Sequence, residues 1–372
     1  MAVVIARSAE ELERLRARWP RIGWEREEAE LDYLLVRART RPEVVAPFAL
    51  VVGREAGAAG RIEERPLPAR LGGRALVAPK ARVLRIVEGG LVGVAAVEAL
   101  RPALRGVDAV AFPPLPVGSE LARAVHHFGN PLRRQPFAPV STRRRLVLPG
   151  SFEEFLASRT RKIREGVRYD SARLEEAFAG ARHVRVLRRP EDAEQLVGDL
   201  DHIGRSSYQR ALGAGFSDTL EQRALARLGL ERGWIRAYVL YCGKEPVAFW
   251  HCATYRGVLV LLRTGFDHDY ARHRPGIYLL MRVVEDAIAD PSVTVVDFGP
   301  GDAPYKRQFS NESHLEREEI VFAPTWRGLR ANALRAPVLA AAAVGRRGLD
   351  PASLTRRVRL RPRRALVALR RS

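Results

Sequence analysis

Hydrophobic and polar positions form their most regular pattern between residues 235 and 298. This stretch predicts strands over 235–242, 247–255 and 258–265, a helix over 276–289, and a β-branched strand over 293–298. Short turns join the first three strands, which makes them antiparallel. A helix joins the strands 258–265 and 293–298, so these two are expected to be parallel neighbours. The start of such a crossover helix presents backbone N–H groups that suit a phosphate, carboxylate or carbonyl oxygen.

The pattern elsewhere predicts further helices and strands. Ser8 caps a short helix over 8–18, and Ser151 with Glu154 forms a capping box for a helical pattern that continues through 159–178. The many Gly, Pro and Ala residues of 54–80 predict loops around short strands. Other strands are expected over 47–52, 83–87, 107–112, 144–148, 184–187 and 318–322, and other helices over 118–128, 190–209 and 218–232.

A chain of 372 residues suggests about two domains. The expected division is 1–143, 144–324 and a basic tail over 325–372. The mixture of strands and helices predicts an α/β (α+β) fold. No apolar run reaches the length of a membrane-spanning helix, and the N-terminus does not read as a signal peptide. Cys242 and Cys252 lie in apolar, strand-like sequence and are expected to be buried free thiols in a cytoplasmic protein.

The formal charge of +20 is concentrated at the C-terminus, where 325–372 contains thirteen arginines, no lysine and one acid, Asp350. Apolar residues such as Leu354 and Leu360 alternate with the arginines. Such a segment can bind anionic lipid headgroups, polyanionic glycans or RNA. A solvated basic tail is the alternative, because arginine is the common cation throughout this chain. Localisation at the inner face of the membrane is therefore an open expectation.

Two short segments carry candidate chemistry. The first, around Pro275 and Gly276, opens the crossover helix, where glycine allows a ligand to approach the backbone and the helix dipole favours an anion. The second follows the strand 293–298 and crowds Gly, Pro and acidic residues at its carboxyl end. There Lys306 could stabilise an oxyanion, and Asp297 or Asp302 could accept a proton. The histidines and acids elsewhere lack ligand spacing, and no metal site is expected.

These two segments resemble the CelD/BioF-like GNAT acetyltransferase domain, which is similar to the Fem-type aminoacyltransferases. The matching pattern is Tyr-x-x-x-x-Pro-Gly before the helix and Asp-Phe-Gly-x-Gly-Asp-x-x-Tyr-Lys-x-x-Phe after the next strand, beginning at Tyr270 and ending at Phe309. The resemblance covers 144–324 well and 1–143 weakly. It implies tandem GNAT-like folds, with mixed sheets flanked by helices and a degenerate first domain.

The resemblance also implies roles for individual residues. Lys306 would polarise the acyl carbonyl, and Asp302 and Tyr305 would position the acceptor or the lysine. The donor, an acyl-CoA co-substrate, would lie against a segment comprising Arg272, His273, Arg274, Pro275, Gly276 and Ile277. The acceptor would be an amine or hydroxyl of a cell-envelope polysaccharide or a related metabolite, in keeping with a family associated with polysaccharide biosynthesis.

The sequence departs from the usual CoA-binding turn, because His273 stands three residues before Gly276 and Tyr278 two residues after it. The sequence therefore lacks the usual motif that binds the pyrophosphate of CoA. An aminoacyl-tRNA donor remains an alternative, which the positive charge also favours. An inactive scaffold that docks to a membrane through 325–372 is the third hypothesis.

Overall fold

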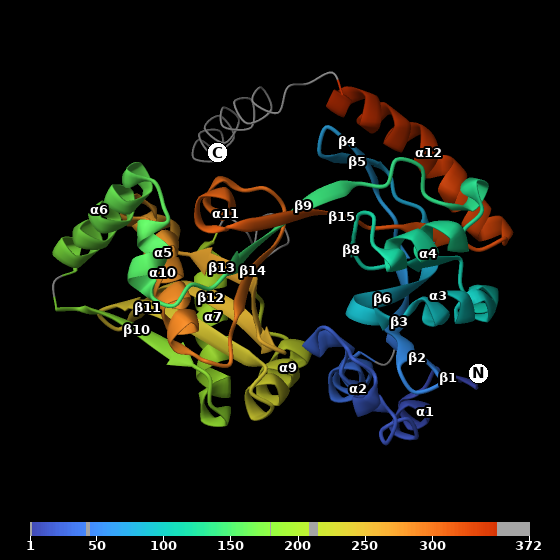
Figure 1. The fold of residues 1–372 in the computed structure, drawn as a ribbon, viewed down its shortest axis with the longest axis horizontal. Helices are drawn as coiled ribbons and strands as arrows, with labels where there is room; N and C mark the ends of the chain where they lie inside the picture. Colours follow the sequence, from blue (N-terminus) through green and yellow to red (C-terminus); the bar gives the residue numbers. More distant parts are fainter. Residues whose placement is uncertain (1, 42–44, 179, 208–214, 348–372) are drawn as a thin grey trace, which may run out of the picture.

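The computed structural model describes residues 2–41, 45–178, 180–207 and 215–347, which form two mixed sheets with helices on both faces (Figure 1). The first sheet has the order β1-β2-β3-β6-β7-β16 and the second the order β10-β11-β12-β13-β14-β9-β15-β8. A short hairpin, β4-β5, completes the described strands. The mixed α/β architecture predicted from the sequence is confirmed.

The strands of the first sheet are β1 (Val3–Ala6), β2 (Val45–Val52), β3 (Ala56–Pro66), β6 (Lys80–Val92), β7 (Ala109–Ala111) and β16 (Ile320–Phe322), and the hairpin is β4 (Ala69–Leu71) with β5 (Arg74–Val77). Helices α1 (Ala9–Glu13) and α2 (Leu31–Thr40) cover one face of the sheet, and α3 (Val94–Ala99) and α4 (Glu120–Phe128) cover the other. β6 and β7 are parallel and are joined through α3. The first half therefore contains its own parallel crossover.

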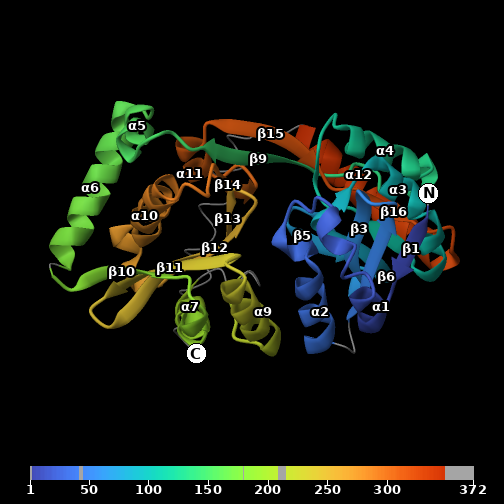
Figure 2. The same ribbon diagram turned by 60° about the horizontal axis from the view of Figure 1, so that its bottom comes forward.

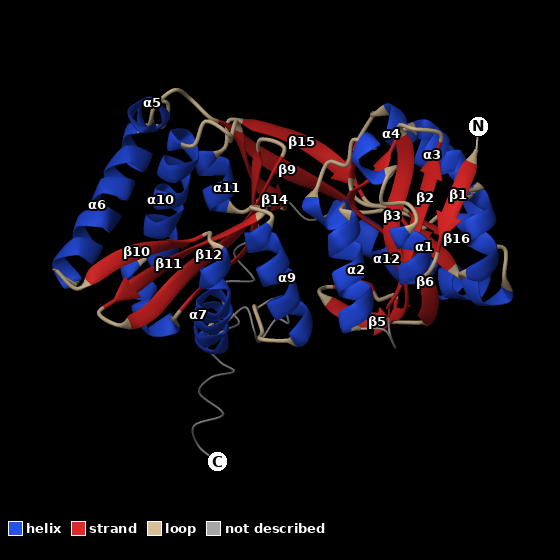
Figure 3. Cartoon of the chain, turned by 90° about the horizontal axis from the view of Figure 1, so that it is seen from below, coloured by secondary structure: helices blue, strands red, loops and turns tan. Residues whose placement is uncertain are grey.

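The strands of the second sheet are β8 (Leu115–Pro116), β9 (Val140–Val147), β10 (Arg182–Leu187), β11 (Ile235–Cys242), β12 (Glu245–Tyr255), β13 (Val258–Phe266), β14 (Val295–Pro300) and β15 (Glu312–Arg317). Helices α5 (Phe152–Ala157), α6 (Arg161–Ala177) and α10 (Pro275–Ala289) pack on one face. Helices α7 (Ala193–Ser206) and α9 (Leu220–Glu231) pack on the other face (Figure 3). Helix α11 (Pro304–Phe309) follows β14.

The predicted crossover in the second sheet is confirmed. β11, β12 and β13 are antiparallel in the predicted order. β13 and β14 are parallel neighbours in the sheet, and α10 connects them in the sequence. Gly243 and Gly257 both have positive φ at the turns between the strands. Cys242 and Cys252 are buried free thiols, as expected. The sequence pattern was sufficient here because these strands are apolar, being buried on both faces, and because short turns fix their pairing.

The prediction of loops around short strands over 54–80 fits the short β4-β5 hairpin but is wrong for the long strand β3. β3 begins with the small residues Ala56-Gly57-Ala58-Ala59-Gly60, which have weak strand propensity. A Cβ on Gly57 would lie 2.9 Å from the Leu50 carbonyl oxygen, and one on Gly60 would lie 2.3 Å from the Arg85 carbonyl oxygen. The glycines therefore allow neighbouring strands to approach closely, and sheet context overrides local propensity.

The two halves exchange strands, so the expected division at residue 144 does not separate the sheets. β9 and β15 run side by side between the two halves in Figure 2. β8 pairs with β15, and β16 returns to pair with β7 in the first sheet. The first sheet thus takes a strand from within the range 144–324.

The first part of the predicted basic tail over 325–372 is a helix packed on the first sheet, which corrects its assignment as a tail. Helix α12 (Trp326–Arg347) packs against β4, β5, β6 and β16. Arg335 is only 4% exposed and donates to Gln135 at 2.6 Å, while Asn332 donates to the Leu132 carbonyl oxygen at 3.0 Å. Leu354, Leu360 and the eight arginines that follow Arg347 lie outside the described residues. None of the described helices is long and apolar enough to cross a bilayer.

Candidate active site

The parallel strands β13 and β14 separate along their length. Their ladder joins Val258, Leu259 and Val260 to Val295, Val296 and Asp297, whereas β13 continues to Phe266 and β14 to Pro300. On its other side β14 pairs with β9, and the register shifts between Asp297 and Pro300. The carboxyl-terminal ends of the two strands therefore part next to the start of α10. This edge of a parallel crossover is where α/β proteins commonly bind ligands.

Helix α10 begins at this opening without a capping side chain. Arg274, the N-cap residue, has φ of +51°, and Pro275 occupies the first turn. The backbone N–H groups of Ile277 and Tyr278 point back to the Arg274 carbonyl oxygen at 3.1 and 3.3 Å. A Cβ on Gly276 would meet only a ring carbon of Phe266, at an ordinary 3.8 Å. Gly276 therefore presents an open backbone surface at the positive end of a long helix.

The three basic residues before Pro275 differ in their surroundings. Arg272 and Arg274 are exposed, and Arg274 forms an ion pair of 2.9 Å with Asp170 of α6. His273 is buried against Phe178, and burial, with Arg272 and Arg173 adding to it, lowers its pKa. His273 is therefore neutral at pH 7. Arg272 and Arg274 are the side chains of this group that can attract an anionic donor.

Trp250 of β12 connects the start of α10 with α11. Its indole N–H donates to the Gly276 carbonyl oxygen at 3.1 Å, and its ring centroid lies 6.1 Å from that of Tyr305. Tyr305 in turn lies 6.4 Å from Phe298 at the end of β14. Aromatic side chains thus support both segments that the sequence analysis singled out, and they bring the two segments to one end of the sheet.

Lys306 projects from α11 onto the end of β14. Its ammonium group donates to the carbonyl oxygens of Pro300 at 2.7 Å and Gly299 at 3.3 Å. Burial lowers the pKa of Lys306, and the nearby Asp297 partly opposes that effect. The side chain is held by backbone oxygens at the parted strand ends, and its remaining N–H can point at an incoming oxygen atom.

Asp297 is the most deeply buried of the predicted catalytic residues, at 1% exposure. Its carboxylate accepts from Arg143 at 2.7 Å, from Arg145 at 3.2 Å and from the Gly299 N–H at 2.7 Å. Burial alone would raise the pKa of Asp297, but these partners hold it below its usual value. A carboxylate so stabilised is a poor proton acceptor. The geometry favours a role for Asp297 in fixing the end of β14.

Asp302 lies at the surface between two arginines. It accepts from Arg144 at 2.6 Å and from Arg307 at 2.8 Å, and the hydrogen bond from Arg144 is the main reason that its pKa lies below the usual value. Successive arginines of β9 thus serve opposite faces, since Arg143 and Arg145 reach Asp297 while Arg144 reaches Asp302. The row Arg143-Arg144-Arg145 was visible in the sequence, but its partners could not be assigned before the pairing of β9 with β14 was known.

A polar cavity of about 430 Å³ lies between the two halves, against the start of the parallel ladder. Arg143 is 4% exposed and links its walls, because it pairs with Glu88 of β6 at 2.7 Å as well as with Asp297 and, at 3.5 Å, with Glu316. Val258, Val260 and Arg256 line the same cavity. The cavity opens on the sheet face opposite α10. The ion pairs of Asp297 with Arg143 and Arg145 therefore lie on the cavity side of the sheet.

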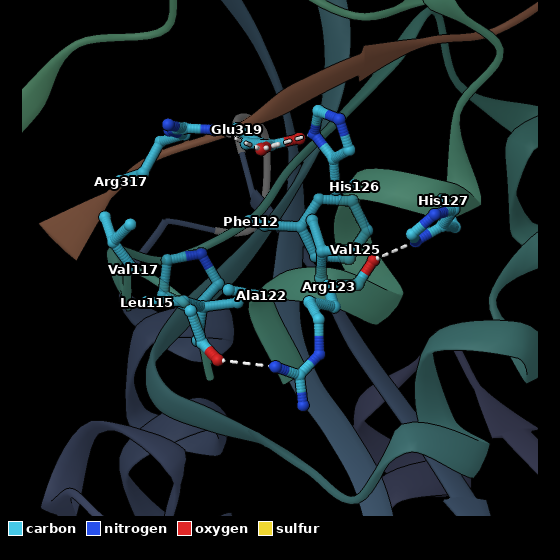
Figure 4. A pocket seen from close by; sticks show the side chains of 12 residues that line it. Phe112, Leu115, Val117, Ala122, Arg123, Val125, His126, His127, Arg317 and Glu319 are labelled. Carbon is cyan, nitrogen blue, oxygen red and sulfur yellow. Dashed lines mark hydrogen bonds and ion pairs between the residues drawn. The ribbon is translucent and has the colours of Figure 1, made fainter. Parts of the chain in front are cut away.

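A second cavity, of about 190 Å³, lies within the first half between β7, α4 and the segment before β16 (Figure 4). Phe112, Leu115 and Val125 form its apolar wall. At its rim the Glu319 carboxylate lies 3.2 Å from His126 Nδ1. This cavity contains none of the predicted site residues.

Residues 161–307 match the family model described as acetyltransferase (GNAT) domain. This range runs from the start of α6 into α11 and includes every site residue predicted from the sequence. None of the curated proteins matches the sequence.

Among solved structures, the fold is similar to the crystal structure of FemX, with a TM-score of 0.53 and 10% sequence identity over 86% of this chain and 96% of that one. A second is the C-terminal domain of a putative lysylphosphatidylglycerol synthetase from Agrobacterium fabrum, with a TM-score of 0.49 and 11% identity over 89% of this chain and 97% of that one. A third is a tandem GNAT protein from the clavulanic acid biosynthesis pathway, with a TM-score of 0.43 and 12% identity over 87% and 99%. Residues 161–307 therefore form a GNAT-type acyltransferase domain, in a chain of two mixed sheets whose fold is similar to that of FemX.

Proposed function

We propose that the second half transfers an acyl group from a thioester donor, an acyl-CoA, to an amine or hydroxyl of a cell-envelope polysaccharide or related metabolite. The observation that supports this most strongly is the parting of β13 and β14 beside the uncapped start of α10. An acyl thioester placed between the strand ends would have its phosphates near Gly276 and its carbonyl near Lys306. We also propose that this domain belongs to the CelD/BioF-like family of GNAT domains.

The surroundings of Gly276 suit a phosphate-bearing donor. The open Cα surface of Gly276 admits a ligand, the helix dipole adds partial positive charge, and Arg272 and Arg274 are exposed beside it. Tyr278, which replaces the small residue of the usual CoA turn, is 4% exposed and stays within the core. It therefore leaves the donor surface clear despite its size.

Lys306 is the residue that we assign to the acyl carbonyl. In the proposed reaction the acceptor nitrogen or oxygen attacks the carbonyl carbon, the carbonyl oxygen gains negative charge, and the carbon–sulfur bond then breaks to release the CoA thiolate. The proton lost by the acceptor neutralises that thiolate. Lys306 would stabilise the oxyanion, and Tyr305 and Asp302 would hold α11 and its loop in position. Asp297 would anchor β14 through Arg143 and Arg145.

The cavity between the halves is the proposed route for the acceptor. It lies on the sheet face opposite α10, so donor and acceptor would reach the parted strands from different sides. Holding the two reactants in this way makes the reaction effectively intramolecular, which is a large source of rate enhancement. The charged lining, including Arg145 and Arg256, suits a polar acceptor such as a glycan or an amine-bearing metabolite.

An aminoacyl-tRNA donor is the second candidate, and the surface of α6 favours it. Arg161, Lys162, Arg168 and Arg173 of this helix are all exposed. Arg274 lies next to α6 through its ion pair with Asp170. These exposed cations therefore lie on a helix next to the start of α10, and binding of RNA to them would weaken steeply with salt.

A thermal-shift panel with acetyl-CoA, longer acyl-CoAs and aminoacyl-tRNA separates these possibilities. A ligand at 100 times its Kd stabilises the folded protein by about 2.7 kcal/mol, and only a donor that binds the folded state will raise Tm. We expect an acyl-CoA to raise Tm, and CoA without an acyl group to raise it less. A shift with aminoacyl-tRNA alone would support the second candidate, and no shift with any donor would support an inactive scaffold.

A further inference from the structure

A separate cavity of about 230 Å³ lies between α2 and the segment Glu27–Ala29 of the first half and α9, β12 and β13 of the second. His251 of β12 lines it. Its neighbour Trp250 faces the α10 side of the sheet, and successive side chains of a strand point to opposite faces. This cavity is therefore on the far side of the sheet from the proposed donor surface. It is also distinct in its lining from the larger cavity at Asp297.

His251 gives this cavity an unsatisfied polar floor. The side chain is 6% exposed, and neither ring nitrogen has a hydrogen-bond partner among the residues that the structure describes. Burial lowers the pKa of His251 to about 3, with Arg263 adding to the effect, so the ring is neutral. A neutral imidazole has one N–H donor and one lone-pair acceptor, and leaving both unpaired in a buried position costs free energy. A bound molecule with polar groups would satisfy both.

Opposite charges line the walls of the cavity. Arg263, opposite His251 in the β12-β13 ladder, donates to Gln222 at 3.1 Å, but no carboxylate lies within ion-pair distance of it in the described part of the chain. Glu27, Glu28 and Arg37 come from the first half. Glu27 pairs with Arg26 at 3.3 Å, whereas Glu28 has a longer contact of 3.7 Å with Arg37, which also reaches Glu221 of α9 at 3.4 Å. The second half thus contributes Arg263, a cation without a carboxylate, and the first half contributes two carboxylates and one arginine.

We propose that this cavity binds a small zwitterion of the amino-acid class, with its carboxylate toward Arg263, its ammonium group toward Glu28, and a polar group against His251. The volume is below the roughly 300–1,000 Å³ of sites for drug-sized ligands, which favours a molecule of this size. Phe216 packs edge-on against His251, with 5.9 Å between the two ring centroids, and provides an apolar surface for the ligand's carbon atoms. The two halves would both contact the ligand, so its binding would hold them together.

Isothermal titration calorimetry of the full chain tests the site without any need for acyl-transfer activity. The probes are glycine, L-serine and L-glutamine. They are compared with two small molecules that each lack one of the two charges: the L-serine methyl ester has no carboxylate, and L-lactate has no ammonium group. We expect saturable binding of one probe per chain, and at least tenfold weaker binding of the ester and of lactate. Binding of the ester as tight as that of L-serine would overturn the proposal, as would no binding by any of the three amino acids.

Variants assign the binding to this cavity. Arg263→Gln and His251→Phe should each weaken binding at least tenfold. His251→Phe should keep or raise Tm, because it removes unsatisfied polar atoms and keeps a ring. Arg185→Gln is the control for the loss of one arginine, because Arg185 is exposed on β10 of the same sheet. This variant should bind the amino acid as tightly as the wild type does.

NMR spectroscopy of the wild-type protein tests the same assignment if a variant does not fold. The side-chain NMR resonances of His251 should shift on titration with the bound amino acid. Unshifted His251 resonances at saturating ligand, or full affinity in both folded variants, would contradict the assignment. Because acyl-CoA is absent throughout, failure of this proposal leaves the proposed acyl transfer untouched.

Discussion

The indole N–H of Trp250 donates to the carbonyl oxygen of Gly276 at 3.1 Å, which fixes the start of α10 against the middle of the sheet. The same ring supports Tyr305, the residue before Lys306. Two segments that are thirty residues apart in the sequence are therefore held against one aromatic side chain. This contact is the physical reason for treating Gly276 and Lys306 as parts of one site.

Replacing Lys306 with Ala should lower turnover about 100-fold, the usual effect of losing one group that stabilises an oxyanion, and should change Tm little. Lys306→Arg keeps a cation and should recover part of the activity. Steady-state kinetics with the donor identified by thermal shift would measure this. Wild-type turnover in Lys306→Ala would remove the lysine from the mechanism, whereas a large fall in Tm would indicate that its bonds to Pro300 and Gly299 are chiefly structural.

Gly276→Leu should raise KM for the donor at least tenfold, because the side chain would occupy the surface where the ligand approaches the backbone. The protein itself has space there, since a Cβ would meet only Phe266 at 3.8 Å, so Tm should not fall. Gly198→Ala is the control, because Gly198 is also helical and exposed and its Cβ would meet nothing within 4 Å. That change should stabilise the fold by about 0.5–1 kcal/mol and leave KM unaltered. An unchanged donor KM in Gly276→Leu would argue against donor binding at α10.

Asp297→Asn should destabilise the protein by about 3 kcal/mol at pH 7, because it leaves buried Arg143 with less compensating charge. The folded-state pKa of Asp297 lies below its usual value, so its stabilising effect is complete above about pH 4, the ordinary value for Asp, and declines as the pH falls through the folded-state pKa. Urea unfolding of both proteins at pH 7, 5 and 3.5 should show a constant difference at the two higher values and a smaller one at pH 3.5. A difference that grows on acidification would contradict this account.

Deletion of residues 348–372 should abolish binding to vesicles that contain anionic lipid while leaving Tm unchanged. The deleted stretch contains eight arginines, each worth about 1 kcal/mol near such a surface, and α12 keeps its contacts with β4, β5 and β6. Neutral vesicles provide the control in a flotation assay. Equal flotation of the full and shortened chains would place any membrane contact elsewhere.

The sequence predicted the part of the fold in which local pattern and short turns determine the pairing. The three hairpin strands from Ile235 to Phe266 and the crossover through α10 belong to this part. The exchange of β8 and β16 between the sheets was not predictable, because pairing across such long separations leaves no local periodicity. Helix α2 was missed although Leu31, Leu34, Leu35 and Ala38 have helical spacing and are all buried.

The candidate site was predictable in its sequence segments but not in its contacts. The Gly/Pro-rich turns located the ends of β14 and the start of α10. The ion pairs of Asp297 and Asp302 depend on arginines of β9 that lie more than 150 residues away in the sequence. His251 gave no signal of its own, because a histidine within an apolar strand is indistinguishable from a core residue until its unpaired nitrogens and the adjoining cavity are seen.

Hydrogen–deuterium exchange with and without a saturating acyl-CoA tests the central claim most directly. The account predicts slower exchange at the amides of residues 276–280 and 299–309, at the start of α10 and around Lys306, with little change in the β4-β5 hairpin. Protection confined to the first half, or unchanged exchange at both segments with a donor known to be bound, would contradict the claim that the parted ends of β13 and β14 hold the donor.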